Sequence, residues 1–108
     1  MHKWSQLMSL ASLLAVTAAA TAQETVKIGV IEPLTGSVAY NGLASVNGAK
    51  LAVAQRNAAG GVLGRKVELV IEDGQCRPAN SVNAAEKLLQ RDKVVALQGA
   101  FCSSATAA

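Results

Sequence analysis

Residues 94–108, VVALQGAFCSSATAA, read as a strand, a turn and the beginning of a helix. Residues 94–97 form a short, continuously apolar run, which is the pattern of a parallel strand covered on both faces. A glycine interrupts the run, and Cys102, Ser103 and Ser104 then form a helix N-cap cluster. Because a helix start presents free N–H groups and hydroxyls at the carboxyl end of a strand, this stretch predicts an anion-binding site.

The first 22 residues have the pattern of a cleavable signal peptide. A basic start at residues 1–3 precedes an apolar core at residues 7–16 that is too short to span a membrane, and an A-x-A cleavage motif follows at residues 20–22. A buried N-terminal helix is the alternative. No cysteine lies at the cleavage site for lipid attachment, so the sequence predicts a soluble, exported mature segment, residues 23–108.

The mature segment has nine Lys or Arg against seven Asp or Glu, an excess too small to predict a nucleic-acid or membrane-surface partner. Both cysteines, Cys76 and Cys102, lie in this segment, and an oxidising compartment would let them pair. Two free, buried thiols remain the alternative. The spacing of the cysteines and the lack of histidine in the mature segment fit no zinc site, so we expect no metal and no cofactor.

The apolar patterns alternate between strand and helix and predict the order β-α-β-α-β. Right-handed crossovers would make this the first part of a doubly wound parallel sheet of the α/β class, with an edge position for the second strand. Three strands bury too little surface for confident independent folding, so we expect the front part of a longer protein. The expected strands are residues 26–31, 66–73 and 94–97, and the expected helices are residues 43–59 and 78–92. Val82, Ala85 and Leu89 place an apolar stripe on the second of these helices.

Two other features follow predicted strands. Tyr40 lies in the expected loop, residues 34–42, where an aromatic ring could form the wall of a pocket; local packing is the alternative. Glu72 and Asp73 are adjacent carboxylates at the end of the second strand. Because neighbouring strand residues point to opposite faces, we do not expect them to share an acid/base or metal site.

Three sequence motifs carry a family resemblance: EPLTG at residues 32–36, NAAGGVLGRKVEL at residues 57–69 and ED at residues 72–73. With these motifs the chain resembles the periplasmic substrate-binding proteins of branched-chain amino acid ABC transporters. Members of that family are several times longer and fold as two α/β lobes, of the periplasmic binding protein type I, that close on a ligand. The resemblance implies that residues 23–108 are the N-terminal part of the first ligand-binding lobe.

The function implied by the resemblance is capture of a small amino acid, branched-chain above all, or a related carboxylate in the periplasm. The protein would deliver this ligand to a membrane permease, and would be a monomer that binds no nucleic acid. A second class is a sensor, because the same lobes serve as extracellular ligand-binding domains of signalling proteins. An enzyme is not expected, because no G-x-S-x-G motif surrounds Ser103 and the mature segment has no histidine to act as a base.

The resemblance also implies roles for particular residues. Relatives that bind leucine, isoleucine and valine have a disulfide at the positions of Cys76 and Cys102, and we expect the bridge because both turns follow strands expected to be adjacent. In those relatives the serine after the second cysteine, here Ser103, hydrogen-bonds the α-carboxylate of the ligand. Some relatives carry an aromatic residue in the loop before the first helix, at a position that aligns with Asn41, next to Tyr40.

Overall fold

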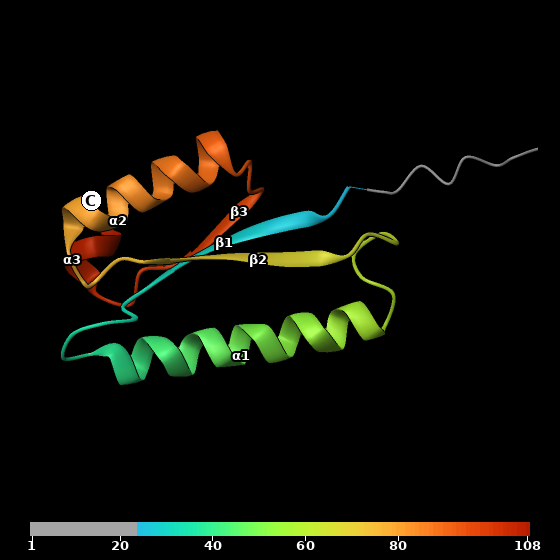
Figure 1. The fold of residues 1–108 in the computed structure, drawn as a ribbon, viewed down its shortest axis with the longest axis horizontal. Coiled ribbons are helices and arrows are strands. Elements are labelled where there is room, and N and C mark those ends of the chain that lie inside the picture. Colours follow the sequence, from blue (N-terminus) through green and yellow to red (C-terminus); the bar gives the residue numbers. More distant parts are fainter. Residues whose placement is uncertain (1–23) are drawn as a thin grey trace, which may run out of the picture.

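The computed structural model of the chain describes residues 24–108, so the predicted signal peptide, residues 1–22, lies outside the described residues. Three parallel strands form one sheet, with helices on both of its faces (Figure 1). The predicted β-α-β-α-β order and the α/β class are confirmed. The elements are β1 (Val26–Glu32), α1 (Ala39–Ala58), β2 (Val67–Asp73), α2 (Pro78–Glu86), the π-helical segment η1 (Lys87–Arg91), β3 (Ala96–Gly99) and α3 (Ser103–Thr106).

The strand order is β2-β1-β3, so β1 is the central strand. The α1 helix covers one face of the sheet and α2 covers the other, as expected for a doubly wound sheet (Figure 1). The predicted edge position of β2 is confirmed. In the register of the strands, Glu32 pairs with Asp73 and Ile31 pairs with Gly99, so all three strands end at the same edge of the sheet. We call this the carboxyl edge; its turns are residues 33–38, 74–77 and 100–102.

The core on the α2 face consists of Ile31, Ala84, Leu88 and Val94, all of them buried. The apolar stripe predicted for this helix, Val82, Ala85 and Leu89, is not the row that forms the core, although Ala85 is partly buried against that core. Val82 is 37% exposed and Leu89 is 49% exposed, whereas the neighbouring row, Ser81, Ala84 and Leu88, is buried. The helix has two apolar sides: one packs on β1, and the other lies along an open groove above β3.

The first helix begins at Ala39, four residues before the predicted start, so Tyr40 and Asn41 belong to its first turn and not to a loop. That prediction treated Gly42 as a loop residue. Gly42 is buried inside the helix, and a Cβ atom at this position would lie 1.9 Å from the carbonyl oxygen of Pro33. Glycine is therefore required by the close approach of α1 to the turn after β1.

The third strand begins two residues later than predicted and is not covered on both faces. All four of its residues are exposed, whereas most residues of β2, the other edge strand, are partly buried. Val94, which we expected in the strand, precedes it; this residue is buried against the end of the second helix, and its N–H donates to the carbonyl of Leu88 at 3.1 Å. Among the helices that the structure describes, none combines the length and apolar character needed to cross a membrane.

Candidate functional site

The topology indicates where this fold binds its ligands. The connection from β1 leads to β2 on one side, and the chain then crosses to β3 on the other side of β1. In open α/β sheets, ligands bind beyond the carboxyl ends of the strands at such a point of reversal. The relevant turns are therefore residues 33–38, after β1, and residues 100–102, after β3, at the end of the sheet where α3 lies (Figure 1).

Cys102 is the N-cap residue of α3, with an extended backbone at φ −83° and ψ 126°. Its carbonyl accepts hydrogen bonds from the N–H groups of Ala105, at 2.9 Å, and Thr106, at 3.0 Å. Ser103 and Ser104 form the first turn and are exposed, as predicted. The expected side-chain cap is absent, since no side chain hydrogen-bonds the start of α3 in the described part of the chain. The N–H groups of Ser103 and Ser104, the first two residues of α3, have no acceptor inside the helix.

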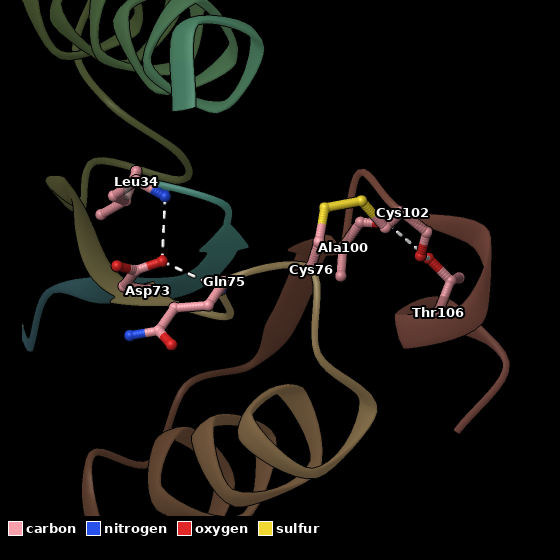
Figure 2. Close-up of a disulfide and its surroundings, with 7 residues drawn as sticks. All are labelled: Leu34, Asp73, Gln75, Cys76, Ala100, Cys102 and Thr106. Atoms are coloured by element: carbon pink, nitrogen blue, oxygen red, sulfur yellow. Dashed lines mark hydrogen bonds between the residues drawn. A yellow bond between two sulfur atoms is a disulfide. The ribbon is translucent and has the colours of Figure 1, made fainter. Parts of the chain in front are cut away.

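A disulfide joins Cys76 to Cys102, with 5.3 Å between their Cα atoms (Figure 2). The predicted pairing is confirmed, but the expectation that the two turns follow adjacent strands is wrong. Because β1 lies between β2 and β3, the bridge connects the turns after the two edge strands across the end of the central strand. The disulfide therefore ties the start of α3, with Ser103, to the turn after β2.

Asp73, the last residue of β2, links two turns of the carboxyl edge. Its Oδ1 atom accepts the backbone N–H groups of Leu34 and Gln75, both at 2.9 Å, and its Oδ2 atom accepts the Thr35 hydroxyl at 2.6 Å. Burial would raise the pKa of Asp73, but the hydrogen bonds from Thr35, Leu34 and Gln75 outweigh it and lower the pKa below its ordinary value. The sequence analysis missed this role, although an aspartate that accepts the backbone N–H of the residue two positions later is a common feature of turns.

The neighbouring carboxylate, Glu72, forms an ion pair with Lys87 on the α2 side of the sheet. Glu72 and Asp73 therefore point to opposite faces, as the strand pattern predicts, and do not form a shared site. Among the described residues, no three His, Cys, Asp or Glu side chains are grouped so that they could hold a metal ion.

A second polar group, on the α1 face, was also missed. The side chain of Glu32 is buried at the end of β1, with 4% of its surface exposed. One of its carboxylate oxygens accepts the hydroxyl of Ser45 from α1 at 2.8 Å, and the Ser45 hydroxyl accepts the amide of Gln98 from β3 at 3.2 Å. These bonds fasten α1 to the ends of β1 and β3.

An open groove of about 300 Å³ lies between α2, β3 and α3. Neither Ser103 nor Ser104 lines it, and neither Tyr40 nor Asn41 does. Tyr40 is 84% exposed at the start of α1, which follows the turn after β1. The structure thus brings Cys102, Ser103 and Ser104 together, and leaves Tyr40 and Asn41 on a different element. The groove has an apolar lining that includes Ile31, Val82, Ala85, Leu89, Leu97 and Ala105.

A family model for periplasmic binding proteins matches residues 25–108, which is nearly all of the described chain. The chain belongs to the periplasmic binding protein family. Its fold is part of the type I domain of these proteins, and the family consists of solute-binding proteins and not of enzymes, in agreement with the sequence-based expectation.

Three relatives illustrate which proteins this periplasmic binding protein is similar to. A leucine-, isoleucine-, valine-, threonine- and alanine-binding protein of Pseudomonas aeruginosa is 37% identical over 97% of this chain and 28% of its own length. The branched-chain amino acid transporter substrate-binding protein LivJ of Streptococcus pneumoniae, solved with isoleucine, has a TM-score of 0.75 and 39% identity over 78% of this chain and 24% of its own. An ABC transporter solute-binding protein of Rhodopseudomonas palustris, solved with 3,4-dihydroxybenzoic acid, has a TM-score of 0.62 and 32% identity over 69% of this chain and 20% of its own. The chain spans about a quarter of the length of these relatives.

Proposed function

We propose that residues 23–108 are the N-terminal part of the first lobe of a periplasmic solute-binding protein that follows a cleavable signal peptide. The whole protein captures a small amino acid, of the branched-chain type, and delivers it to the membrane permease of an ABC importer as a monomer. The observation that carries this proposal is the similarity to the isoleucine-bound protein of Streptococcus pneumoniae, at 39% identity over 78% of this chain.

The chemistry of the ligands bound by relatives supports a more specific proposal. Isoleucine and 3,4-dihydroxybenzoic acid have different side groups, but each carries a carboxylate. At the carboxyl edge, Ser103 and Ser104 are exposed and begin α3, and their own N–H groups have no acceptor inside the helix. We therefore assign the carboxylate of the ligand to this helix start, held by a serine hydroxyl and by the backbone N–H groups beside Cys102.

The side group of the ligand is assigned to the start of α1. Tyr40 exposes 84% of its surface there, and Asn41 lies next to it, so both are free to contact a bound molecule. An aromatic wall distinguishes ligands by shape, whereas a helix start distinguishes them by charge. Truncation of Tyr40 should therefore change which side group is preferred more than it changes the need for a carboxylate.

Calorimetric titration of the whole protein tests this assignment. Isoleucine should bind the wild type, and isoleucine amide, which lacks the carboxylate charge, should bind far more weakly. The Ser103→Ala variant loses a hydrogen bond to a charged group, so it should bind isoleucine roughly tenfold to a hundredfold more weakly while keeping its fold.

A matched control is Ser81→Ala. The Ser81 hydroxyl is buried in α2 without a hydrogen-bond partner in the described residues, so its removal should leave isoleucine affinity unchanged. If Ser103→Ala binds isoleucine as tightly as the wild type, or if the wild type binds the amide equally well, the carboxylate is not held at this helix start. If the wild type binds the dihydroxybenzoate and not isoleucine, the amino-acid assignment is wrong.

A further inference from the structure

The carboxylate of Asp73 is the point at which two turns of the carboxyl edge are joined. Each of its oxygens accepts at least one hydrogen bond, and the three donors lie in two turns. Leu34 and Thr35 belong to the turn after β1, and Gln75 belongs to the turn after β2. Leu34 and Thr35 lie 39 and 38 positions away from Asp73 in the sequence. The turn that leads into α1 is thus attached to the end of β2 by one side chain.

The same attachment continues through the disulfide to the third turn. Gln75, whose N–H binds Asp73, precedes Cys76, and Cys76 is bonded to Cys102 at the start of α3 (Figure 2). Hydrogen bonds and one covalent bond therefore connect the turn after β1 to Ser103, although no direct hydrogen bond joins those two turns in the described residues.

The backbone of the turn after β2 needs this support. Gln75 and Cys76 both have left-handed backbones, with φ of 53° and 54°. This conformation is uncommon for residues other than glycine, and it persists only where surrounding contacts impose it. The bond from Gln75 N–H to Asp73 and the disulfide at Cys76 are two such contacts.

The start of α3 is held by three kinds of attachment. The backbone joins it to β3, the buried residue Ala105 lies where α3 contacts α2, and the disulfide joins Cys102 to Cys76 (Figure 2). Of these attachments, the disulfide is the one that leads to the turn held by Asp73, so the position of this start relative to the turn before α1 depends in part on what holds Cys76.

We propose that Asp73 is a positioning residue for the ligand site: it fixes the turn that leads to Tyr40 relative to the disulfide-linked start of α3 that carries Ser103. This inference rests on the proposed function, because it assigns the ligand to these two segments. Asp73 does not touch the ligand. It acts by holding both halves of the site in the binding geometry before the ligand arrives, which lowers the cost of ordering them on binding.

The test compares three variants of the whole protein, titrated with isoleucine. Asp73→Asn keeps the size of the side chain, but its neutral amide oxygen accepts the N–H groups of Leu34 and Gln75 more weakly than a carboxylate does, and its amide nitrogen cannot accept the hydroxyl of Thr35. This variant should weaken binding by about tenfold. Thr35→Val keeps the shape of Thr35, removes only one of the three donors, and should weaken binding by a few-fold. If Asp73→Asn folds poorly, this milder variant still tests the proposal. Glu72→Gln is the control, since it removes the adjacent charge, whose partner is Lys87 on the other face.

Two readouts separate positioning from a general loss of stability. Hydrogen exchange at the N–H groups of Leu34 and Gln75 should become faster in Asp73→Asn and remain unchanged in Glu72→Gln. Isoleucine affinity should fall in Asp73→Asn and Thr35→Val and remain at the wild-type value in Glu72→Gln. Thiol titration of the unfolded, unreduced variants should find no free thiols, so that the disulfide is known to be intact.

The outcomes are distinguishable from those that test the proposed function. If the wild type binds isoleucine and Asp73→Asn binds it equally tightly, Asp73 is not a positioning residue, even if the variant melts at a lower temperature. Equal weakening in Glu72→Gln and Asp73→Asn would also overturn the inference, because the effect would then follow from charge or stability alone. If the wild type does not bind isoleucine, the proposed function fails, and this inference fails with it.

Discussion

The turns after β2 and β3 lie at the same edge of the sheet and share a disulfide, but they are held in different ways. The turn after β2 is fixed by the carboxylate of Asp73, which accepts three hydrogen bonds. The turn after β3 has no charged centre: the Thr106 hydroxyl donates to its carbonyls, Phe101 exposes 52% of its surface, and Ser103 and Ser104, which follow the turn, are exposed. The turn after β2 thus has a carboxylate whose two oxygens both accept hydrogen bonds, whereas the turn after β3 and the helix start that follows it expose polar and apolar side chains.

The difference separates residues that build the site from residues that are available to a ligand. A carboxylate whose oxygens already accept three hydrogen bonds has little capacity left for another molecule, whereas exposed hydroxyls and first-turn N–H groups do have it. The turn after β2 is therefore suited to support, and the turn after β3 to binding. Three predictions test this difference between the two turns, in order of decreasing expected effect.

The largest effect concerns the open β3 side. The segment of residues 23–108, produced alone, should melt without a cooperative transition, because apolar side chains along α2 and β3 are uncovered: Leu89 is 49% exposed and Leu97 is 42% exposed. Thermal melting followed by circular dichroism, together with a measurement of molecular mass, checks this. A sharp cooperative melt of a monomer would show that the β3 side is stable without further cover.

The second prediction separates the two turns by removing their bridge. In the whole protein, the double variant Cys76→Ala/Cys102→Ala should lose roughly 3–4 kcal/mol of unfolding free energy in urea, as expected when a loop of this length is no longer closed in the unfolded chain. Hydrogen exchange should accelerate more at the N–H groups of Ala105 and Thr106, which donate to Cys102, than at the N–H of Gln75, because Asp73 still holds Gln75. Equal acceleration at both turns would mean that the carboxylate gives the turn after β2 no support of its own.

The smallest effect is a pH dependence of the free energy of unfolding that comes from the carboxylate of Asp73, at the end of β2. The pKa of Asp73 lies below its ordinary value of 3.8, because the hydrogen bonds from Thr35, Leu34 and Gln75 outweigh the effect of burial. The stabilisation from the ionised carboxylate is therefore fully present above the ordinary value and is lost as the pH falls through the lowered value. Because solvent screens this partly exposed carboxylate, wild type should be more stable than Asp73→Asn by no more than about 1 kcal/mol at neutral pH, and the difference should shrink below the ordinary pKa of 3.8.

Urea unfolding of both proteins across this pH range is the measurement. Glu68→Gln is a suitable control, since Glu68 lies on the same strand and, within residues 24–108, accepts a hydrogen bond only from the exposed hydroxyl of Thr25. A difference between wild type and Asp73→Asn that stays constant down to the acid end would show that the hydrogen bonds do not favour the ionised form.

The parts of the fold that depend on local patterns could be predicted from the sequence. The β1 and β2 strands follow from alternating and β-branched apolar residues, and α2 begins at Pro78, where proline is tolerated because a first-turn N–H needs no partner. The helix start at Ser103 follows in the same way from small polar residues after a strand. The disulfide was predictable because a signal-peptide pattern and an even cysteine count favour a pair.

The parts that depend on distant contacts could not be predicted. Gly42 looks like a turn residue in sequence, and only its approach to Pro33 in the folded chain shows why a helix contains it. Val94 looks like a strand residue, but it packs with Leu88 in the core before β3 begins. The role of Asp73 was missed for the same reason, since Leu34 and Thr35 are far away in the sequence.

The bond between Cys76 and Cys102 encloses all of α2, η1 and β3 in a covalent ring. A protease that cuts the backbone once inside this ring, for example beside the exposed Lys93 or Val95 in the connection to β3, would not release a fragment. The nicked protein would migrate as one species on a non-reducing gel and separate into two only after a reductant is added. Proteolytic damage to this connection would therefore stay hidden as long as the protein remains in an oxidising compartment.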